Sequence, residues 1–243
     1  MHIPILYQDA DYVVVSKPAG LLVHRSLLDR GETQFAMQLV RDQIGQHVFP
    51  VHRLDRPTSG ALIFALSSGA ARLMSEEFSA RRVAKTYWAV VRGVPPASVR
   101  VDYPLREELD AMTDVISEKD AQSAVTEVWL LGSVELPFAV DRYPTSRYSL
   151  VEARPWTGRK HQIRRHLRHL GHPIVGDITH GVGKHNRFFE EHFKIRRLLL
   201  ASVAVSFAHP VSGEMISVRA PLAEDFCRLL VAMGWSEHAT AQA

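Results

Sequence analysis

The sequence predicts an α+β protein in which strands outnumber helices. Short runs of β-branched and aromatic residues recur along the chain and are bounded by turn-forming residues. The few stretches with helical periodicity do not alternate regularly with these runs, which argues against a βαβ arrangement. The chain has 243 residues, 46% of them hydrophobic, which is enough to build one substantial core. We therefore expect a single domain over residues 1–243.

The first elements follow from local patterns. Apolar residues at 5–7 and 12–15 flank the turn-rich segment 8–11, which predicts a β-hairpin. Residues 17–20 include a proline and a glycine, so the second strand is expected to end there. Residues 36–44 carry one apolar face and are followed by a glycine, the pattern of a short helix.

A strand–loop–strand unit is expected next. Apolar runs at 49–54 and 61–66 predict two strands, and the loop 55–60 joins them. Ser67 or Ser68 can then cap a helix. Its predicted inward face consists of Ala70, Leu73, Met74 and Phe78.

The remaining strands surround an acidic stretch. Residues 85–91, 125–131 and 147–153 are rich in aromatic and β-branched residues and are predicted as strands. Residues 107–120 contain six acids and one base without clean periodicity. We therefore expect a surface insertion over 107–124, and we expect the last few residues to be disordered.

The composition restricts the class of protein. A net charge of +3 with a pI near 9.1 permits a nucleic-acid partner without requiring one. Cys227 is the only cysteine, so no intrachain disulfide forms, which is compatible with a reducing cytoplasm. The N-terminus lacks the pattern of a signal peptide, and no apolar run is long enough to span a bilayer. These features predict a soluble, cytoplasmic protein without a membrane partner.

Asp55 is the first candidate for chemistry. It lies where an apolar strand gives way to a loop containing proline, serine and glycine, a position that often carries reacting groups. Taken alone, an aspartate in this position caps a turn. Here His52, Arg53 and Arg56 surround the carboxylate with donors and positive charge, which favours an ionised, functional group.

A basic helix is the second candidate. Ile163, Leu167 and Leu170 have helical spacing, with Thr157 as a predicted N-cap and Gly171 as a predicted C-cap. Residues 153–176 contain six Lys or Arg, four His and no acid. The helix therefore presents either a solvated basic face or a surface that binds phosphates.

The four histidines of this segment do not predict a metal site. No thiol or carboxylate accompanies them, and the neighbouring guanidinium groups would repel a cation. We expect neutral or phosphate-contacting histidines, and no metal.

At this point the sequence resembles the RluA-type pseudouridine synthases. The segment from His52 to Asp55, followed by Thr58, Ser59 and Gly60, looks like the signature of that family. Further blocks follow in the order found in the family. They lie at residues 6–7, 17–20, 85–89, 157–164, 171–177 and 209–210. One departure is Ala201, where the family pattern suggests histidine.

The resemblance implies a fold and a domain organisation. The expected fold is a mixed, mainly antiparallel sheet with flanking helices and a central RNA-binding cleft. The chain begins directly with catalytic-domain strands, so we expect no additional N-terminal S4-like RNA-binding domain.

The resemblance also implies roles for individual residues. Asp55 becomes the catalytic carboxylate, Arg164 the guanidinium that orients it, and Tyr87 the aromatic residue that stacks on uracil and serves in the late removal of the C5 proton. No cofactor is implied. The target uridine must be flipped out of a helix, and Arg53 is expected to fill the vacated space. The remaining predicted RNA contacts are Arg56, Arg159, Lys160, His161, Gln162, Arg165 and Arg168.

The substrate is narrowed by four segments. Residues 23–26, 41–49, 142–145 and 158–162 look like the tRNA-specific members of the family, which implies isomerisation of uridine 65 in tRNA. Three alternatives stay open: the same chemistry on ribosomal RNA or at another tRNA position, and a catalytically silent RNA-binding protein. A glycosidase would need a second acid beside Asp55, where the sequence has arginines and a proline. No obligate protein partner is inferred.

Overall fold

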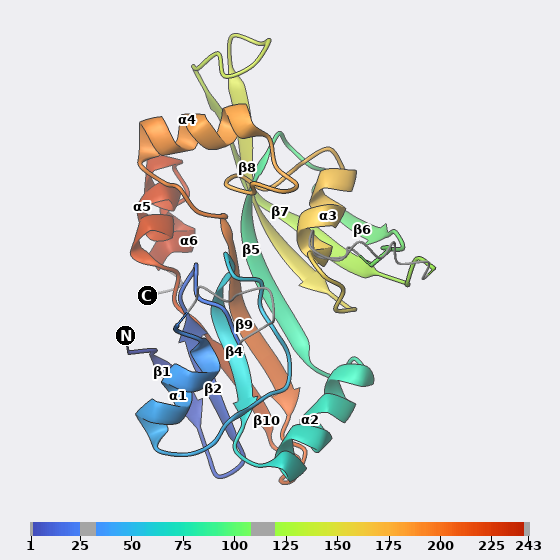
Figure 1. The fold of residues 1–243 in the computed structure, drawn as a ribbon. Helices are drawn as coiled ribbons and strands as arrows, with labels where there is room; N and C mark the ends of the chain where they lie inside the picture. The colour runs from blue at the N-terminus through green and yellow to red at the C-terminus, as the bar shows by residue number, and fades with distance from the viewer. Residues whose placement is uncertain (1, 25–32, 108–119, 241–243) are drawn as a thin grey trace. The chain divides into compact units, whose positions relative to one another are not determined.

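The computed structural model describes residues 2–24, 33–107 and 120–240, which fall into two compact units. The first unit consists of Met1–Tyr87 and Leu200–Ala243, and the second of Trp88–Leu199 (Figure 1). Most of the expected acidic insertion, residues 108–119, lies outside the described residues, as do residues 241–243 of the expected disordered end. The expectation of a single domain stays a prediction.

The first unit is built on a sheet whose order is β1-β2-β4-β9. The pairs β1–β2 and β2–β4 are antiparallel, whereas β4 and β9 run parallel. Two further strands join this sheet, because β3 pairs with β4 and β10 pairs with β9. The strands are β1 (Ile5–Gln8), β2 (Tyr12–Lys17), β3 (Phe49–Pro50), β4 (Ser59–Ala65), β9 (Leu200–Ala208) and β10 (Met215–Arg219).

The helices of the first unit confirm the predicted capping. The described helices are α1 (Ala36–Ile44), α2 (Ser68–Ser79), α5 (Glu224–Ala232) and α6 (Ser236–Thr240). Helix α1 ends at Gly45, whose φ of 69° is readily adopted by glycine. Helix α2 begins after Ser67, because the Ser67 side chain accepts a hydrogen bond from the Ala70 amide at 3.1 Å.

One predicted strand is much shorter than expected. The apolar run at 49–54 forms only the two-residue strand β3. Beyond it, Nε2 of His52 rather than a backbone carbonyl accepts the Ile63 amide hydrogen, at 3.0 Å. A side chain thus replaces the backbone ladder, and the following residues are free to form the Asp55 loop.

Strand β4 forms the centre of the first unit. All of its residues, Ser59–Ala65, are buried. Its apolar residues share a core with β2, α2, β9 and β10. The loop that carries Asp55 therefore leads directly into the most enclosed strand of this unit.

The second unit has its own strands and helices. The chain enters it along β5, and the strand order is β5-β8-β7-β6. Strands β7 and β8 are antiparallel over Thr126↔Pro155 to Leu136↔Ser146. Strand β7 therefore extends well beyond the predicted run 125–131, whereas β8 is close to the predicted run 147–153. The described elements are β5 (Ala84–Arg92), β6 (Ser98–Asp102), β7 (Val125–Leu136), β8 (Ser146–Pro155), α3 (Gln162–His169) and α4 (Gly183–Phe193).

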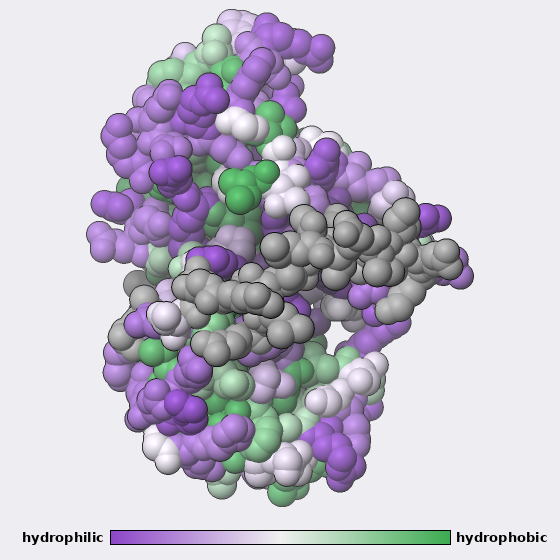
Figure 2. All heavy atoms as spheres, in the orientation of Figure 1, coloured by the Kyte–Doolittle hydropathy of each residue, from purple (hydrophilic) through white to green (hydrophobic). Residues whose placement is uncertain are grey.

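The fold class is confirmed: the strands pair mainly antiparallel and helices flank them. Hydrophilic side chains dominate the face of the molecule shown in Figure 2. Among the described helices, none has the length and apolar character needed to cross a membrane. The predicted RNA-binding cleft stays a prediction.

Candidate active site

The Asp55 loop is a tight turn at the entrance to β4. The Thr58 amide donates to the Asp55 carbonyl at 3.0 Å, and Leu54 anchors the loop with 5% of its surface exposed. Asp55 itself is half-buried, so its carboxylate is held by the fold and yet partly accessible. This is the arrangement expected of a reacting group on a rigid scaffold.

Lys17 fastens this loop from a distant part of the sequence. Its side chain is 0% exposed, and Nζ donates to the carbonyls of Pro18 at 2.9 Å, Leu21 at 2.8 Å and Arg56 at 3.2 Å. The Gly20 amide also donates to the Arg56 carbonyl. A buried ammonium is tolerated only with such partners. Sequence reasoning recognised residues 17–20 as a strand end and missed that Lys17 holds the backbone next to Asp55.

Gly60 explains why the loop signature ends in glycine. Its φ is +109°, and a Cβ atom at this position would lie 2.0 Å from the Ser202 carbonyl oxygen. Ser59 and Gly60 pair with Ala201 and Ser202 on the parallel strand β9. Only glycine allows β4 and β9 to approach this closely. Ala201 is 2% exposed, so the departure from the family pattern falls on a buried strand position beside Ser59.

Tyr87 is brought close to Asp55. Its side chain is 8% exposed. Burial and, to a smaller extent, the negative charge of Asp55 raise the pKa of the Tyr87 phenol above its ordinary value of 10.0. The buried Thr58 hydroxyl has no hydrogen-bond partner among the described residues. The first unit therefore places a carboxylate, a neutral phenol and an unsatisfied hydroxyl around the β4 entrance.

Arg164 is the buried cation of the second unit. Its Nε and Nη2 donate to the two carboxylate oxygens of Asp177 at 2.7 and 2.8 Å. Their side chains are 4% and 0% exposed. Burial alone would raise the pKa of Asp177, but hydrogen bonds from Arg164 and from the His180 and Thr179 amides hold it below its ordinary value. Asp177 thus fixes the plane of the guanidinium, a role that the sequence did not reveal.

The predicted pairing of Arg164 with Asp55 joins residues of the two units, so it stays a prediction.

The predicted N-cap of the basic helix is wrong. Thr157 is not the N-cap, because α3 begins only at Gln162. Thr157 instead accepts from the Val125 amide and donates to Gln162. Gln162 is 5% exposed and also bonds the Arg159 amide, the Val125 carbonyl and the Thr126 hydroxyl. Its side-chain amide makes four hydrogen bonds inside the unit, and its predicted RNA contact stays a prediction.

The C-terminal end of the helix was predicted correctly. Gly171 has a φ of +81°. The His172 amide donates to the Leu167 carbonyl, and the Gly171 amide donates to the Arg168 carbonyl. This pair of bonds is the Schellman motif that glycine permits.

The remaining predicted RNA contacts lie at or near the surface. Arg53, Arg56, Arg159 and Arg168 are exposed, whereas Lys160, His161 and Arg165 are half-buried. Several of these side chains bind carbonyls and thereby brace the loops around them. These bonds run from Arg56 to Gly20, from Arg159 to Ser123, from Arg165 to Arg106 and from Arg168 to Thr179.

His52 does not contribute charge to Asp55, contrary to our expectation. Burial and then the charge of Lys85 lower the pKa of His52 to about 3. The His52 ring stacks on the Phe78 ring with 4.8 Å between the ring centroids, and its Nε2 accepts the Ile63 amide hydrogen. His52 is therefore a neutral structural residue at neutral pH.

The histidines of the basic segment each have a non-metal neighbour. His166 lies between the Thr126 hydroxyl and the Tyr103 carbonyl, and His172 bonds the Arg92 carbonyl. His161 contacts His180, and His169 stacks on Tyr103. Within the residues that the structure describes, no group of three or more potential ligands is placed to hold a metal ion.

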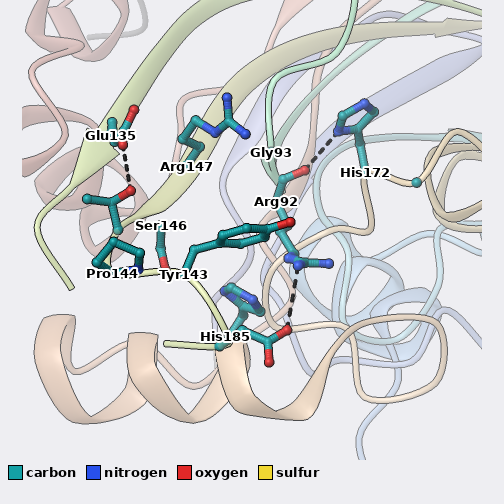
Figure 3. Close-up of a pocket in the computed structure, with 12 residues that line it drawn as sticks. Arg92, Gly93, Glu135, Tyr143, Pro144, Ser146, Arg147, His172 and His185 are labelled. Carbon is teal, nitrogen blue, oxygen red and sulfur yellow. Dashed lines mark hydrogen bonds and ion pairs between the residues drawn. The ribbon is translucent and has the colours of Figure 1, made fainter. Parts of the chain in front are cut away.

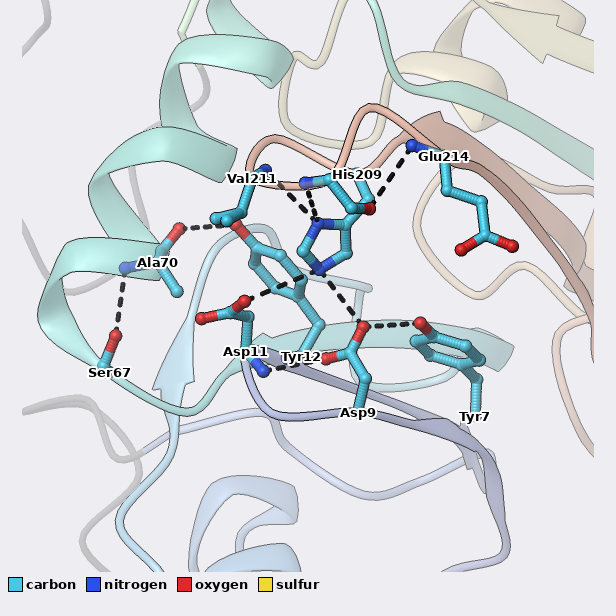
Figure 4. Close-up of polar contacts among 10 residues, drawn as sticks. Tyr7, Asp9, Asp11, Tyr12, Ser67, Ala70, His209, Val211 and Glu214 are labelled. Carbon is cyan, nitrogen blue, oxygen red and sulfur yellow. Dashed lines mark hydrogen bonds and ion pairs between the residues drawn. The ribbon is translucent and has the colours of Figure 1, made fainter.

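The last signature block, His209, closes a polar cluster in the first unit (Figure 4). Nδ1 of His209 accepts from the Val211 and Ser212 amides, so the ring proton of the neutral form lies on Nε2, which is 3.1 Å from Asp9. Asp9 also accepts from the Tyr7 hydroxyl and the Tyr12 amide. The cluster ties the β1–β2 turn to the β9–β10 turn, which gives these signature residues a structural role.

Comparison with known proteins relates the chain to one family. Residues 11–169 match the family described as RNA pseudouridylate synthase. The chain is 54% identical to the tRNA pseudouridine synthase C of Vibrio cholerae over 96% of each protein. It is 52% identical to the Haemophilus influenzae protein of the same name, over 95% of this chain and 98% of that protein.

Solved structures show the same fold. Human RNA Pseudouridylate Synthase Domain Containing 4 is 28% identical, with a TM-score of 0.70 over 95% of this chain and 93% of that chain. Human RNA Pseudouridylate Synthase Domain Containing 1 is 25% identical, with a TM-score of 0.67 over 96% of this chain and 95% of that chain.

Proposed function

The chain belongs to the RNA pseudouridine synthase family, and we propose that it isomerises uridine to pseudouridine in tRNA, at uridine 65. The family is one of isomerases. The tRNA substrate is supported by full-length similarity to proteins named tRNA pseudouridine synthase C. The observation that carries the proposed chemistry is the joint placement of Asp55 and Tyr87 at the entrance to β4, where the charge of one shifts the pKa of the other.

The reaction breaks the N1–C1′ bond, turns the uracil and joins C5 to C1′; the proton is lost from C5 and gained at N1. No electrons are exchanged with a second molecule, so a positioned carboxylate is a sufficient protein reagent. We assign that role to Asp55. The loop bonds from Lys17 and Thr58 hold its backbone in place.

Tyr87 supports this assignment with a specific protonation state. A phenol is neutral at pH 7 at its ordinary pKa, and the raised pKa of Tyr87 keeps it neutral to higher pH. A neutral phenol stacks on uracil and donates a hydrogen bond, and it accepts the C5 proton only if its own proton is passed on. We therefore propose stacking on the uracil and hydrogen-bond donation as the main roles of Tyr87, with base catalysis as the lesser one.

Arg164 is proposed to orient Asp55 through its guanidinium. A double-mutant cycle with Asp55→Asn and Arg164→Lys tests this. If the two residues act as one unit, the double variant loses no more activity than Asp55→Asn alone. Additive losses of activity in the double variant would show that Arg164 acts independently of Asp55.

RNA binding is proposed for the predicted contact residues that are exposed or half-buried. Flipping the target nucleotide costs roughly a few kcal/mol, and Arg53 is proposed to fill the vacated space. Phosphate contacts are proposed for Arg56, Arg159, Lys160, Arg165 and Arg168, with His161 beside them. Charge reversal at Lys160 and Arg168 should lower both the affinity for tRNA and the salt dependence of that affinity. If neither changed, the surface that carries Lys160 and Arg168 would not be an RNA-binding surface.

The function is tested by mapping pseudouridine by mass in tRNA from cells lacking the gene. We expect position 65 to lose the modification, wild-type protein to restore it, and Asp55→Asn to fail. Persistence at position 65 without the gene would exclude the narrow assignment. Loss at another tRNA position or in ribosomal RNA would support the same chemistry on that substrate. If the protein released no tritium from RNA labelled at uridine C5, the alternative of a catalytically silent RNA-binding protein would be supported.

A further inference from the structure

The second unit contains a cavity that none of the residues assigned above explains. Its volume is about 370 Å³, the size range of sites for small molecules or single nucleotides. It lies between the ends of β5, β7 and β8, the start of α4 and the turn after α3. Its polar wall includes Arg92, Glu135, Asp141, Tyr143, Arg147, His172 and His185.

His185 is the buried polar group of this cavity. It is 4% exposed, and its Nδ1 lies 2.7 Å from the Tyr148 hydroxyl. Its Nε2 has no hydrogen-bond partner among the described residues. A buried polar atom without a protein partner on a cavity wall points to a ligand that bonds it, because leaving it unsatisfied costs roughly 1–3 kcal/mol.

The direction of the hydrogen bond with Tyr148 decides what His185 offers a ligand. Burial, followed by the charge of Arg92, lowers the pKa of His185 to about 4, so the ring is neutral at pH 7. A phenol that donates to Nδ1 leaves the single ring proton on Nε2. The cavity wall then offers a hydrogen-bond donor, which requires an acceptor on the ligand.

The ring is held firmly in this orientation. His185 packs edge-on against Tyr148, and Phe189 of the same helix packs on Tyr148 from a centroid distance of 4.8 Å. Tyr148 is 0% exposed. The donor is therefore preorganised by the core of the unit.

Two arginines supply the charge. Arg147 is exposed, and the structure gives its side chain no partner among the described residues. Arg92 has Asp141 as its ion-pair partner at 3.7 Å, which is too long for a hydrogen bond and leaves its donors available. Figure 3 shows the ring of Tyr143 extending between Arg147 on one side and His185 on the other.

The two carboxylates of the wall limit the charge of the ligand. Asp141 is already bound by Lys184 at 3.1 Å, and Glu135 accepts from the Thr145 hydroxyl. Counting Arg92, Arg147 and Lys184 against these two acids leaves one positive charge. A phosphodiester, with one negative charge and unesterified acceptor oxygens, matches that balance better than a terminal or multiple phosphate. Tyr143, 53% exposed, adds an aromatic face for an adjacent base.

We propose that this cavity binds one backbone phosphodiester of an RNA chain, with Arg147 and Arg92 at the phosphate oxygens and His185 Nε2 as the buried donor. The proposal rests on the proposed function in that RNA is the ligand. It adds a binding subsite on residues outside the Asp55 signature and outside helix α3.

The first test is equilibrium binding of a tRNA transcript to the full-length protein at several salt concentrations. Asp55→Asn is used as the background so that no turnover occurs. Arg147→Ala should weaken binding about tenfold and reduce the slope of log K against log salt by about 1. Arg228→Ala removes the same charge from an exposed position on α5 outside the cavity and should leave affinity and slope unchanged. Equal behaviour of the two variants would overturn the proposal.

The second test identifies the source of the phosphate. The dinucleotide UpU and inorganic phosphate are titrated against protein labelled with ¹⁵N-histidine, and the Nε2 resonance of His185 is followed. A shift with UpU that is lost in Arg147→Ala supports the RNA subsite. A response to inorganic phosphate alone would overturn it in favour of a free-anion site. If Arg147→Ala weakens tRNA binding while the wild-type protein forms no pseudouridine, the subsite stands and the proposed function fails.

Discussion

Replacing Gly60 with alanine tests the close approach of β4 and β9 on which the Asp55 site depends. The added Cβ atom would lie 2.0 Å from the Ser202 carbonyl oxygen and 2.7 Å from the Ser202 carbonyl carbon. An ordinary carbon–oxygen contact needs about 3.3 Å, so the strands must separate by more than about 1 Å. Because both neighbours are backbone atoms, no side-chain rotation relieves the clash.

The expected cost has two parts. Overpacking of this kind costs about 1–3 kcal/mol, and a non-glycine residue at positive φ adds about 1–2 kcal/mol. Gly213→Ala carries the backbone cost alone, because Gly213 has a φ of +75° and a Cβ atom added there would meet nothing within 4 Å. The difference between the two variants therefore measures the overpacking cost. Gly60→Ala should therefore be less stable than Gly213→Ala by about 1–3 kcal/mol in urea denaturation.

The activity should follow the displacement. Ser59 and Gly60 begin β4 immediately after the Asp55 loop, so a shift here misplaces the carboxylate relative to Tyr87. A displacement of about 1 Å costs on the order of 100-fold in rate, measured by tritium release from RNA labelled at uridine C5. Equal unfolding free energies for the two alanine variants, with full activity in both, would refute the reasoning.

Three further predictions concern buried polar groups. Lys17→Met removes the ammonium that binds three carbonyls and should cost roughly 2–4 kcal/mol with loss of tritium release; a stable, active variant would show that the Asp55 loop does not need it. Asp177→Asn should cost about 3 kcal/mol, whereas Asp141→Asn, which breaks an exposed pair with Lys184, should leave the free energy of unfolding almost unchanged; similar losses in urea denaturation would contradict the importance of burial. The pKa of His52 is depressed in the folded state to about 3 from 6.5, so below pH 6.5 the unfolded chain binds a proton that the folded chain does not. The stability that His52 contributes is therefore fully present above pH 6.5. The free energy of unfolding falls by about 1.4 kcal/mol per pH unit as the pH drops toward 3. His52→Asn, which still accepts a hydrogen bond but does not titrate, should flatten the pH dependence of unfolding; an identical slope in both proteins would rule His52 out as the source.

The local elements of this protein are determined by the sequence alone. The β1–β2 hairpin, α1 with Gly45, α2 with its Ser67 cap and the glycine after α3 were all predicted, because each depends on residues within a few positions of one another. The family was also evident from the ordered signature blocks, and the match over residues 11–169 confirms it. Asp55 entered as a candidate from its loop position and charged flanks, and Tyr87 entered from the resemblance to the family.

The tertiary structure decided what each polar residue does. From the sequence, Lys17 was interpreted as part of a strand end, His52 as a source of charge for Asp55, and Gln162 as an RNA contact. The structure buries all or part of each side chain and gives it hydrogen-bond partners between 11 and 39 residues away in the sequence.

The physical reason is that burial and charge state depend on the whole fold. A histidine is a cation or a neutral acceptor according to its desolvation, and a glutamine is a ligand or a strut according to which donors surround it. Sequence spacing carries the period of a helix or strand but not the partners that long-range packing supplies. The sequence therefore determined the family, the local elements and the candidate nucleophile, whereas only the folded chain revealed Lys17, Asp177 and the close contact at Gly60 that hold the candidate residues in place.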